Sequence, residues 1–400
     1  MTIHHPSWPY EQLDTDRIRR EGWQPTAFRD FVLKVHQRCN LACDYCYVYE
    51  LADQSWRDRP KIINPVVRRA ATRRIAEHAA QHGLDRVNVI LHGGEPLLAG
   101  AERLVALTAE LRAAMPRTCR LSVGMQTNGV KLDAATLDLL ATENVRIGVS
   151  VDGIAADHDR HRRFSNGAGS HQAVDAALRL LGSDAYRHLF AGLLCTVNPD
   201  NDPIATYEGL LGYHPPAIDL LLPHANWEHP PPAGGAHGVW LTQIFDRWYD
   251  APRRGTRIRL FEEVMNLLLG GSSRSEQVGL SPVAVAVIET DGAIEQVDSL
   301  KSAYAGACST GLNVLTDPFD AALRHPGVVA RQIGVKALSE ACRECPIHRV
   351  CGGGHYAHRY RPGEGFRNPS VYCADMQVLI RHIRQRVAAD LTRLAGGSHQ

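Results

Sequence analysis

Three cysteines within eight residues carry the most specific chemical signal in the chain. Cys39, Cys43 and Cys46 are spaced C-x3-C-x2-C. One short loop of this kind can hold an iron–sulfur cube through three thiolates, whereas a cube used only for electron transfer normally takes four. One iron is then open to a substrate. A structural zinc loop is the alternative, but zinc takes four ligands and usually C-x2-C pairs.

A second cysteine group lies near the C-terminus. Cys342, Cys345 and Cys351 are spaced C-x2-C-x5-C, and Cys373 follows. Four thiolates would close the coordination of a second cube, which then need not bind a substrate. A four-cysteine zinc site is the alternative for this group.

Polar or glycine-rich segments follow three of the expected strands. These segments are Gly93-Gly94-Glu95-Pro96, Gln126-Thr127-Asn128-Gly129 and Ser150-Val151-Asp152-Gly153. Barrels and open α/β sheets bind their ligands at the carboxyl ends of strands, because the following loops converge on one face. The sequence therefore predicts that these segments meet the first cysteine loop.

The elements that must position these groups alternate between β-rich runs and amphipathic helical stretches, a pattern typical of parallel strands joined by helical crossovers. We expect strands at 31–35, 86–91, 119–126, 146–151, 189–197 and 217–222. We expect helices at 65–81, 101–114, 133–141, 172–181, 239–249 and 256–269. Residues 284–289 and 293–297 read as a hairpin with an Asp-Gly turn.

The predicted fold class is α/β, a partial (β/α)6 barrel with a small C-terminal iron–sulfur domain. Six strands are too few for a closed eight-stranded barrel. We expect an N-terminal extension (1–27), the barrel (28–235), linking helices (236–280) and the C-terminal domain (281–400).

Composition narrows the class of partner. The formal net charge of the 400 residues is +1, and no dense Lys/Arg run is interleaved with aromatic residues, which argues against nucleic acid. No stretch of 18 apolar residues and no secretory signal is evident, so we expect a cytoplasmic protein without membrane association. Tight cysteine clusters in such a chain indicate metal binding or catalysis, while Cys119 and Cys195 stand alone in apolar runs and are expected to be buried.

The first cysteine group, with Tyr45 before its last cysteine, resembles the signature of radical S-adenosylmethionine (SAM) enzymes. The resemblance implies that a [4Fe–4S] cluster on Cys39, Cys43 and Cys46 binds SAM and yields a 5′-deoxyadenosyl radical. It also implies cofactor contacts from the glycine-rich and polar segments, in which Glu95 contacts the methionyl amino group, Ser150 the ribose or carboxylate, and Arg162 the carboxylate. The implied cofactor-binding residues are Gly93, Gly94, Glu95, Gln126, Asn128, Ser150, Asp152 and Arg162.

The second group resembles the SPASM extension of radical SAM enzymes that modify peptides, which implies an auxiliary [4Fe–4S] cluster on Cys342, Cys345, Cys351 and Cys373. Two positions that hold cysteines in the two-cluster pattern hold Val297 and His355 here. We therefore expect one auxiliary cluster and leave Cys308 out of the metal ligands. Asp298 matches an aspartate that acts as the base in sulfatase-maturing relatives, and an ordinary turn aspartate is the alternative. His355, His358 and Tyr360 are expected only to pack or line a loop.

The segments 222–227, 351–360 and 368–375 are similar to those of FxsB-type maturases. This resemblance implies a ribosomal precursor peptide as substrate, an aromatic ring to Cβ crosslink (a cyclophane) as product, and an electron donor such as ferredoxin or flavodoxin. The alternatives are thioether, formylglycine or epimer formation by the same initiation. A third reading, from another class, is an iron–sulfur carrier or a zinc-stabilised peptide-binding module.

Overall fold

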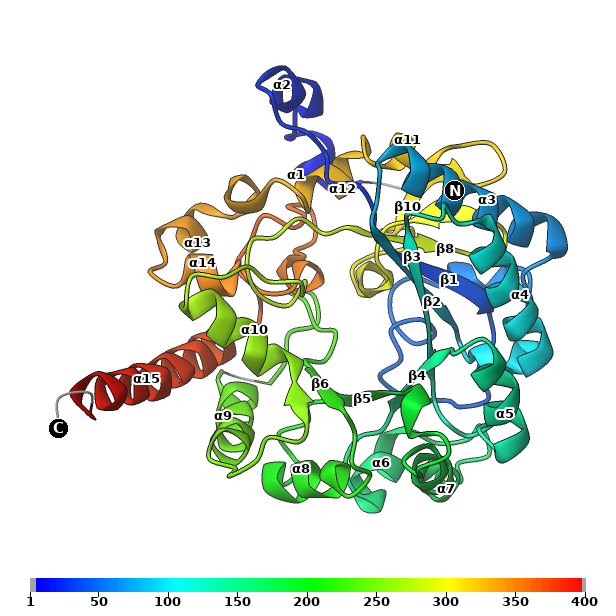
Figure 1. Ribbon diagram of the computed structural model, residues 1–400. Helices are drawn as coiled ribbons and strands as arrows, with labels where there is room; N and C mark the ends of the chain where they lie inside the picture. The colour runs from blue at the N-terminus through cyan, green and yellow to red at the C-terminus, as the bar shows by residue number, and fades with distance from the viewer. Residues whose placement is uncertain (1–4, 233, 398–400) are drawn as a thin grey trace.

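The computed structural model describes residues 5–232 and 234–397, and a single curved sheet organises them (Figure 1). Neighbouring strands from β1 to β6 pair in parallel. Their bounds are β1 (Asp30–His36), β2 (Arg86–Gly93), β3 (Arg120–Thr127), β4 (Arg146–Ser150), β5 (Phe190–Thr196) and β6 (Ala217–Leu221). These six strands lie where the sequence predicts them, and the partial barrel is confirmed.

Helices cover the outer side of this sheet, as Figure 1 shows. They are α3 (Pro65–Gln81), α4 (Ala101–Ala114), α5 (Ala134–Thr142), α6 (Ala155–His161), α7 (His171–Leu181) and α8 (Pro203–Leu211). Helix α3 begins as expected, because the Asn64 side chain accepts hydrogen bonds from the backbone N–H groups of Val66 and Val67 and Pro65 occupies the first turn. Alternate β2 residues such as Val87, Val89 and Leu91 are fully buried.

The C-terminal part adds strands to the same sheet. Strand β8 (Val285–Ile288) pairs in parallel with β1, and β9 (Ala293–Glu295) and β10 (Ser309–Asn313) follow antiparallel. The predicted hairpin is thus present, with Gly292 at φ +89° in its turn. The sheet order is β10-β9-β8-β1-β2-β3-β4-β5-β6-β7, where β7 is Arg257–Ile258. Because β8 continues the barrel, no break in the sheet separates the two predicted domains.

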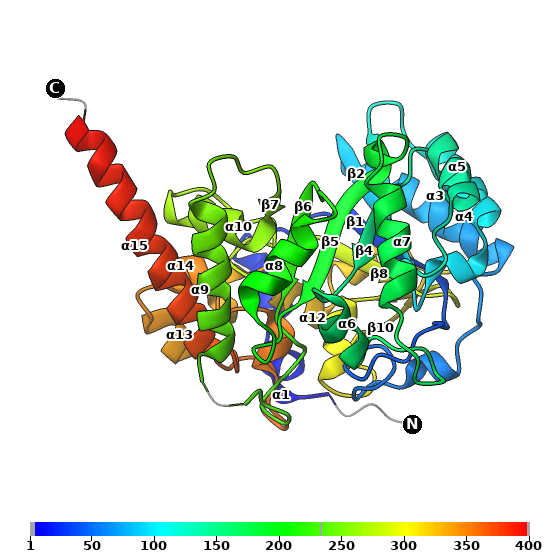
Figure 2. The same ribbon diagram turned by 90° about the horizontal axis from the view of Figure 1, so that it is seen from below.

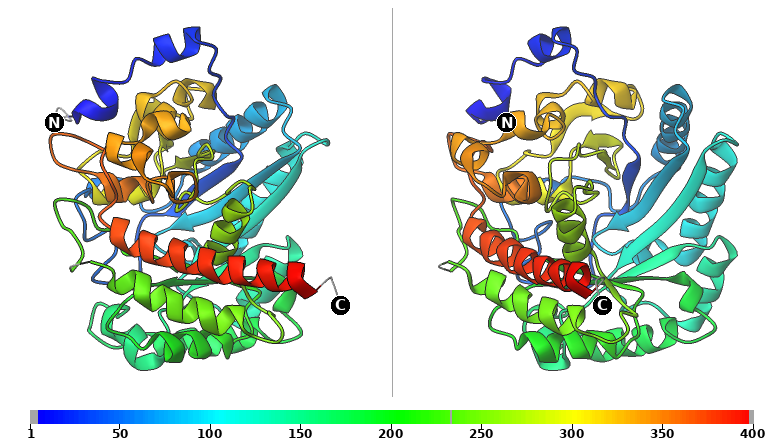
Figure 3. Two further views of the ribbon diagram at one scale, coloured as in Figure 1. Left: turned by 90° about the vertical axis from the view of Figure 1, so that its left-hand side faces the viewer. Right: turned by 60° about the vertical axis from the view of Figure 1, so that its left-hand side comes forward.

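The remaining helices gather on the other side of the barrel opening. They include α9 (Ala236–Tyr249), α10 (Arg259–Leu268), α13 (Glu340–Glu344), α14 (His348–Cys351) and α15 (Cys373–Gly397). Figures 2 and 3 show α15 running alongside α9 and projecting from the body, a long helix that the sequence analysis did not predict. None of the helices in the described ranges combines the length and apolar character needed to cross a bilayer.

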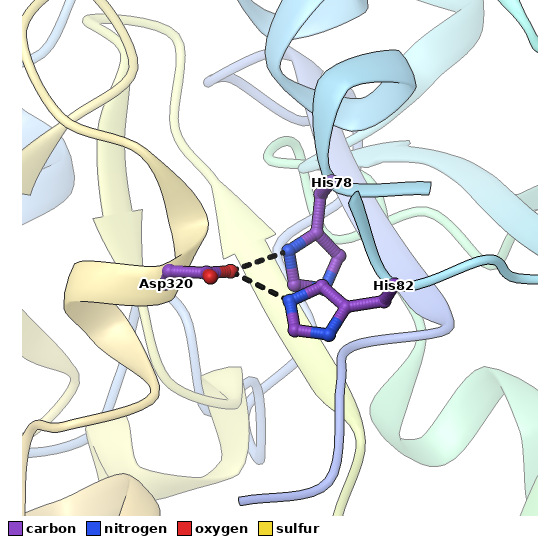
Figure 4. A group of neighbouring side chains, drawn as sticks. All are labelled: His78, His82 and Asp320. Atoms are coloured by element: carbon purple, nitrogen blue, oxygen red, sulfur yellow. Dashed lines mark hydrogen bonds and ion pairs between the residues drawn. The ribbon is translucent and has the colours of Figure 1, made fainter. Parts of the chain in front are cut away.

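The short elements α1 (Ser7–Tyr10), α2 (Thr15–Arg20), α11 (Phe319–Ala322) and α12 (Pro326–Ala330) lie around the C-terminal strands. Figure 4 shows how α11 is attached to α3: Asp320 lies 3.0 Å from His78 Nδ1 and 2.9 Å from His82 Nε2. The other nitrogen of His78, Nε2, accepts a hydrogen bond from the Phe28 N–H at 3.0 Å. Nδ1 of His78 therefore carries the proton and donates a hydrogen bond to Asp320. The buried His78 imidazole has no free lone pair for a metal, so this His/His/Asp group holds α11 against α3.

Candidate active site

A cavity of about 250 Å³ opens at the carboxyl ends of the barrel strands. The first cysteine loop, which follows β1, forms one wall and contributes Cys39, Cys43 and Cys46. The ends of β2 to β6 form the rest. The expected convergence of the cysteine loop and the polar segments at one edge is therefore what the structure shows.

The cysteine loop and the glycine pair fit an iron–sulfur cluster. Burial raises the pKa of Cys39 to about 11 and that of Cys43 to about 12, so the metal-free thiols are protonated and a bound metal is needed to stabilise the thiolates. A Cβ atom on Gly94 would overlap the Tyr49 hydroxyl and the Arg38 carbonyl, so only glycine lets this segment lie so close to the cysteine loop.

Polar side chains from the strand ends and from the segment after α6 also line the cavity. Gln126 Nε2 donates to Ser150 Oγ at 2.9 Å, and both residues line the cavity. Arg162 also lines it, and its Nη1 donates to the Tyr45 hydroxyl at 2.9 Å. Among the described residues the buried Arg162 Nε has no hydrogen-bond partner, so the guanidinium has an N–H available for an anionic group.

Two predicted contact residues lie behind the cavity wall. Glu95 is completely buried, and its carboxylate accepts hydrogen bonds from Leu97 N (2.9 Å), Thr127 Oγ1 (2.8 Å) and Asn128 N (2.8 Å). Asp152 accepts from Thr196 N at 2.9 Å and from the Tyr45 hydroxyl. Neither residue is among those that line the cavity, so both position the loops that do.

Asn128 remains at the cavity surface. Its Nδ2 donates to Asn40 Oδ1 at 2.8 Å and lies 3.6 Å from Cys39 Sγ. A donor this close to a thiolate would stabilise negative charge on the sulfur. We assign Asn128 to the support of the cysteine loop.

The four C-terminal cysteines line a second cavity, of about 230 Å³. Cys342 lies in α13, Cys345 follows it, Cys351 ends α14, and Cys373 begins α15. The surrounding surface is mostly apolar, with Ile347 and Pro369 among its lining residues. Burial raises the pKa of Cys351 to about 11. The donor set fits a four-thiolate cluster or a zinc ion.

The positions that depart from the two-cluster pattern lie outside this second cavity. Val297 is buried in an apolar cluster, and the buried Cys308 thiol donates to the Val297 carbonyl at 3.2 Å. His355 is half-buried beside Glu276, with His355 Nε2 3.9 Å from Glu276 Oε2. That Val297, Cys308 and His355 bind no cluster stays a prediction. Cys119 and Cys195 are buried, as expected.

Asp298 belongs to a buried charge network beneath the site. Its carboxylate lies 2.6 Å from Lys34 Nζ and 3.6 Å from Lys301 Nζ. Burial disfavours the charge, but these two ammonium groups hold the pKa of Asp298 well below its usual range. Asp298 does not line the cavity. Its assignment as the base stays a prediction, and its pairing makes it a weak proton acceptor.

Sequence reasoning missed several residues at the far end of the cavity. Leu194, Thr196, Leu221 and Leu222 provide a more apolar lining at the ends of β5 and β6, and His224 follows β6. The signal that could have found them is their position directly at strand ends, the same criterion that found Gln126 and Ser150. Their apolar types drew no attention because they match buried strands equally well.

With the fold and the cavity established, comparison with known proteins shows what the chain resembles. Residues 33–202 match the model of the Radical SAM superfamily, the segment that contains the first cysteine loop, Gly93, Gly94, Gln126, Ser150 and Arg162. This region therefore has the radical SAM fold, and the chain resembles radical SAM enzymes. SAM and a [4Fe–4S] cluster are therefore its implied cofactors.

Particular relatives extend over most of the chain. The cysteine-type anaerobic sulfatase-maturating enzyme of Clostridium perfringens is 23% identical over 362 residues, which cover 84% of this chain and 90% of the relative. The serine-type anaerobic sulfatase-maturating enzyme of Klebsiella aerogenes is 28% identical over 365 residues, covering 85% and 82%.

Solved structures share the fold. Native anSMEcpe with bound AdoMet and the Cp18Cys peptide superimposes with a TM-score of 0.77 at 20% identity, covering 91% of this chain and 99% of that one. Streptococcus suis SuiB bound to its precursor peptide SuiA gives a TM-score of 0.57 at 15% identity, covering 93% and 82%. The likeness thus includes the C-terminal part as well as the barrel.

Proposed function

We propose that the chain is an oxidoreductase that modifies a peptide by removing a hydrogen atom from the β-carbon of one residue. The observation that carries the proposal is the single cavity that combines three thiols of one loop, a close-packed glycine pair and an arginine with a free N–H. A SAM-loaded cluster, when bound, supplies a 5′-deoxyadenosyl radical. The rest of the chemistry depends on how the chain holds its ligands.

Cys39, Cys43 and Cys46 would hold the cluster at one wall. The backbone of Gly93 and Gly94 would approach the methionyl group, and Arg162 would bind its carboxylate through the N–H that the protein leaves unpaired. Gln126 and Ser150 would bind the ribose from the opposite wall. The apolar end around Leu194 and Leu221 is left for the peptide side chain, away from bulk water.

The relatives favour one product. The Clostridium perfringens and Klebsiella aerogenes relatives are cysteine-type and serine-type anaerobic sulfatase-maturating enzymes, and they match this chain along more than four-fifths of its length. We therefore propose oxidation of a serine or cysteine β-carbon to the aldehyde formylglycine as the first candidate reaction. The outcome we expected from the sequence, a cyclophane, takes second place.

The observation that keeps the cyclophane as a candidate is the apolar end of the cavity, which would accommodate an aromatic ring beside the attacked β-carbon. Thioether formation and epimerisation have no such feature in their favour. Cys342, Cys345, Cys351 and Cys373 would hold the auxiliary cluster, and a low-potential carrier such as ferredoxin or flavodoxin would supply electrons. We propose a ribosomally made peptide as the substrate and the cytoplasm as the location.

The test begins with anaerobic reconstitution of the chain with iron and sulfide, followed by reduction in the presence of SAM. Wild type is expected to form 5′-deoxyadenosine, and Cys39→Ala, Cys43→Ala and Cys46→Ala are each expected to form none. Continued formation in these variants, or zinc in place of iron at this loop in the purified protein, would refute the proposal.

The product is tested with short synthetic peptides that place an aromatic residue two positions before serine, cysteine or asparagine. A carbonyl reagent such as dinitrophenylhydrazine reacts with formylglycine but not with a ring to Cβ crosslink. Loss of two hydrogens from the serine peptide with hydrazone formation supports the first candidate. The same mass loss without hydrazone formation, and with the two residues joined in the fragmentation spectrum, supports the cyclophane.

A further inference from the structure

The proposed reaction releases a proton inside the cavity, whichever of the two products forms. A hydrogen atom leaves the β-carbon and joins the deoxyadenosyl carbon. The substrate radical then loses one electron to an oxidised iron–sulfur centre and also loses one proton. In formylglycine formation the proton comes from the O–H or S–H group as a C=O or C=S bond forms. In cyclophane formation it comes from the ring C–H after the C–C bond has formed. The proton needs an acceptor near the peptide. This inference therefore rests on the proposed function.

We infer that His224, at the end of β6, accepts this proton and passes it to His355 and Glu276. Two imidazoles line the cavity, and only one is suited to the task. His92 lies at the glycine pair, with its Nδ1 3.3 Å from the Lys34 ammonium, so a proton on His92 would place a second cation against the first. His224 lies at the opposite, apolar end where the peptide would bind.

The surroundings of His224 suit a proton acceptor. Its ring packs edge-on against Tyr47 with centroids 4.7 Å apart, and its Nδ1 is buried without a hydrogen-bond partner among the described residues. Burial lowers the pKa of His224 to about 4, so the resting imidazole is neutral and has a free lone pair. The carboxylates of Glu276 and Asp298 favour its protonated form.

Further imidazoles lead away from the cavity. The ring centroid of His224 lies 5.9 Å from that of His355 and 6.1 Å from that of His358, and these two are 5.0 Å apart. His358 is buried and His224 and His355 are half-buried, and each of the three has one buried ring nitrogen without a hydrogen-bond partner among the described residues. Side-chain hydrogen bonds to neighbours do not fix these nitrogens, so small ring rotations can bring them within proton-transfer reach.

The chain of groups ends at a carboxylate. His355 Nε2 lies 3.9 Å from Glu276 Oε2, and Arg331 Nη2 holds the other oxygen, Glu276 Oε1, at 2.8 Å. Glu276 and Arg331 line a separate small cavity of about 40 Å³ in the C-terminal part. The position that would carry a cysteine in the two-cluster pattern thus carries an imidazole between His224 and the partly exposed carboxylate of Glu276.

Asp298 is a poorer acceptor on the same geometry. It is held between Lys34 and Lys301, and it does not reach the cavity surface. Its charge stabilises a protonated His224 from behind. We assign Asp298 a positioning role and His224 the transfer.

The experiment uses the reconstituted, reduced enzyme with whichever synthetic peptide wild type consumes, deuterated at the β-carbon. Glutamine fills much of the volume of an imidazole, but its side chain does not accept a proton at neutral pH. In His224→Gln, deuterium transfer into 5′-deoxyadenosine should stay within about threefold of wild type, because hydrogen abstraction precedes proton loss. Product per 5′-deoxyadenosine should fall roughly 100-fold, the lower range for loss of a general base. His224→Asn provides a second test in case glutamine disturbs folding.

His78→Gln is the matched control, since His78 is a buried imidazole that the structure places outside the cavity. Its product per 5′-deoxyadenosine should equal that of wild type. His355→Gln tests the transfer of the proton away from His224. It should lower the product formed per 5′-deoxyadenosine about tenfold, because the proton then returns to the radical adduct more often than it leaves.

An unchanged ratio in both His224 variants, with iron content and circular dichroism like wild type, would overturn the assignment of His224. An unchanged ratio in His355→Gln would overturn the exit route. Absence of SAM cleavage by wild type is a different failure, because it would overturn the proposed function before His224 is tested.

Discussion

Replacing Lys301 by methionine should destabilise the fold more than any change of a single surface charge. Lys301 is 2% exposed, and its ammonium lies 2.7 Å from Glu289 Oε1 and 3.6 Å from both Glu295 Oε2 and Asp298 Oδ1. The buried network joins three cations, Lys34, Arg59 and Lys301, to Glu289, Glu295 and Asp298, and Arg59 also pairs with the more exposed Asp291 at 3.3 Å. Lys301→Met leaves one buried negative charge uncompensated.

The magnitude follows from that imbalance. Removing one partner of a buried ion pair costs about 3–5 kcal/mol, and the burial of Lys301 leaves little solvent to screen the loss. An unfolding entropy of about 2 cal/mol/K per residue gives about 0.8 kcal/mol/K for a chain of this length. The expected fall in the melting midpoint is therefore about 4–6 °C.

The assay is anaerobic thermal unfolding of the reconstituted protein, followed by circular dichroism. Lys336→Met is the matched control, because the Lys336 side chain is 58% exposed and lies 3.9 Å from Glu21, and its midpoint should stay within about 1 °C of wild type. Adding Glu289→Gln to Lys301→Met should recover part of the loss by restoring the charge balance. Equal midpoints for Lys301→Met and Lys336→Met would refute the view that the buried network is a set of mutually dependent charges.

Three further predictions concern acidity and the two cavities. Burial lowers the pKa of His78 to about 4 and that of His158 to about 3, so both side chains are neutral in the folded protein at neutral pH. In the unfolded chain each has a pKa of about 6.5. Below pH 6.5 the unfolded chain therefore binds protons that the folded protein does not, and the free energy of unfolding falls. Each of the two histidines should lower the free energy of unfolding by about 1 kcal/mol between pH 6.5 and 5.5, which would appear as a falling melting midpoint. A constant midpoint over that range would contradict this prediction. Cys342→Ala should lower bound iron by roughly half while leaving SAM cleavage without peptide intact, and iron content equal to wild type would contradict the four-cysteine site. Gly94→Ala should abolish SAM cleavage, because the added methyl group collides with Tyr49 and the Arg38 carbonyl, and wild-type cleavage would show that the close packing is not needed.

Much of this molecule could be predicted from its sequence because the barrel repeats one local rule. Each strand of the barrel is a short apolar run, and each chemical motif follows a strand, so the positions of Cys39, Gly93 and Ser150 along the chain determine that they meet. The prediction weakens where side chains compete for the same role. Glu95 and Asp152 have the right type and position for cofactor contacts, but backbone N–H groups take up their carboxylates.

What could not be predicted depends on contacts between distant segments. Nothing near Val285 indicates that β8 would pair with β1, more than 240 residues earlier, rather than form a separate sheet. The grouping of His224 with His355 likewise arises only when the C-terminal loop packs against the end of β6. The sequence analysis did not predict the long helix α15, because it considered only Cys373 in this segment.

The parallel pairing of β8 with β1 has a consequence for how this protein can be divided. A fragment ending before residue 285 would leave the backbone of Asp30–Leu33 without the partners that Val285–Ile288 provide. An uncovered strand edge of this kind recruits other chains and leads to aggregation. The catalytic barrel should therefore be insoluble when expressed by itself, and insertions that aim to separate the two halves should be placed after Asn313, beyond the last strand of the shared sheet.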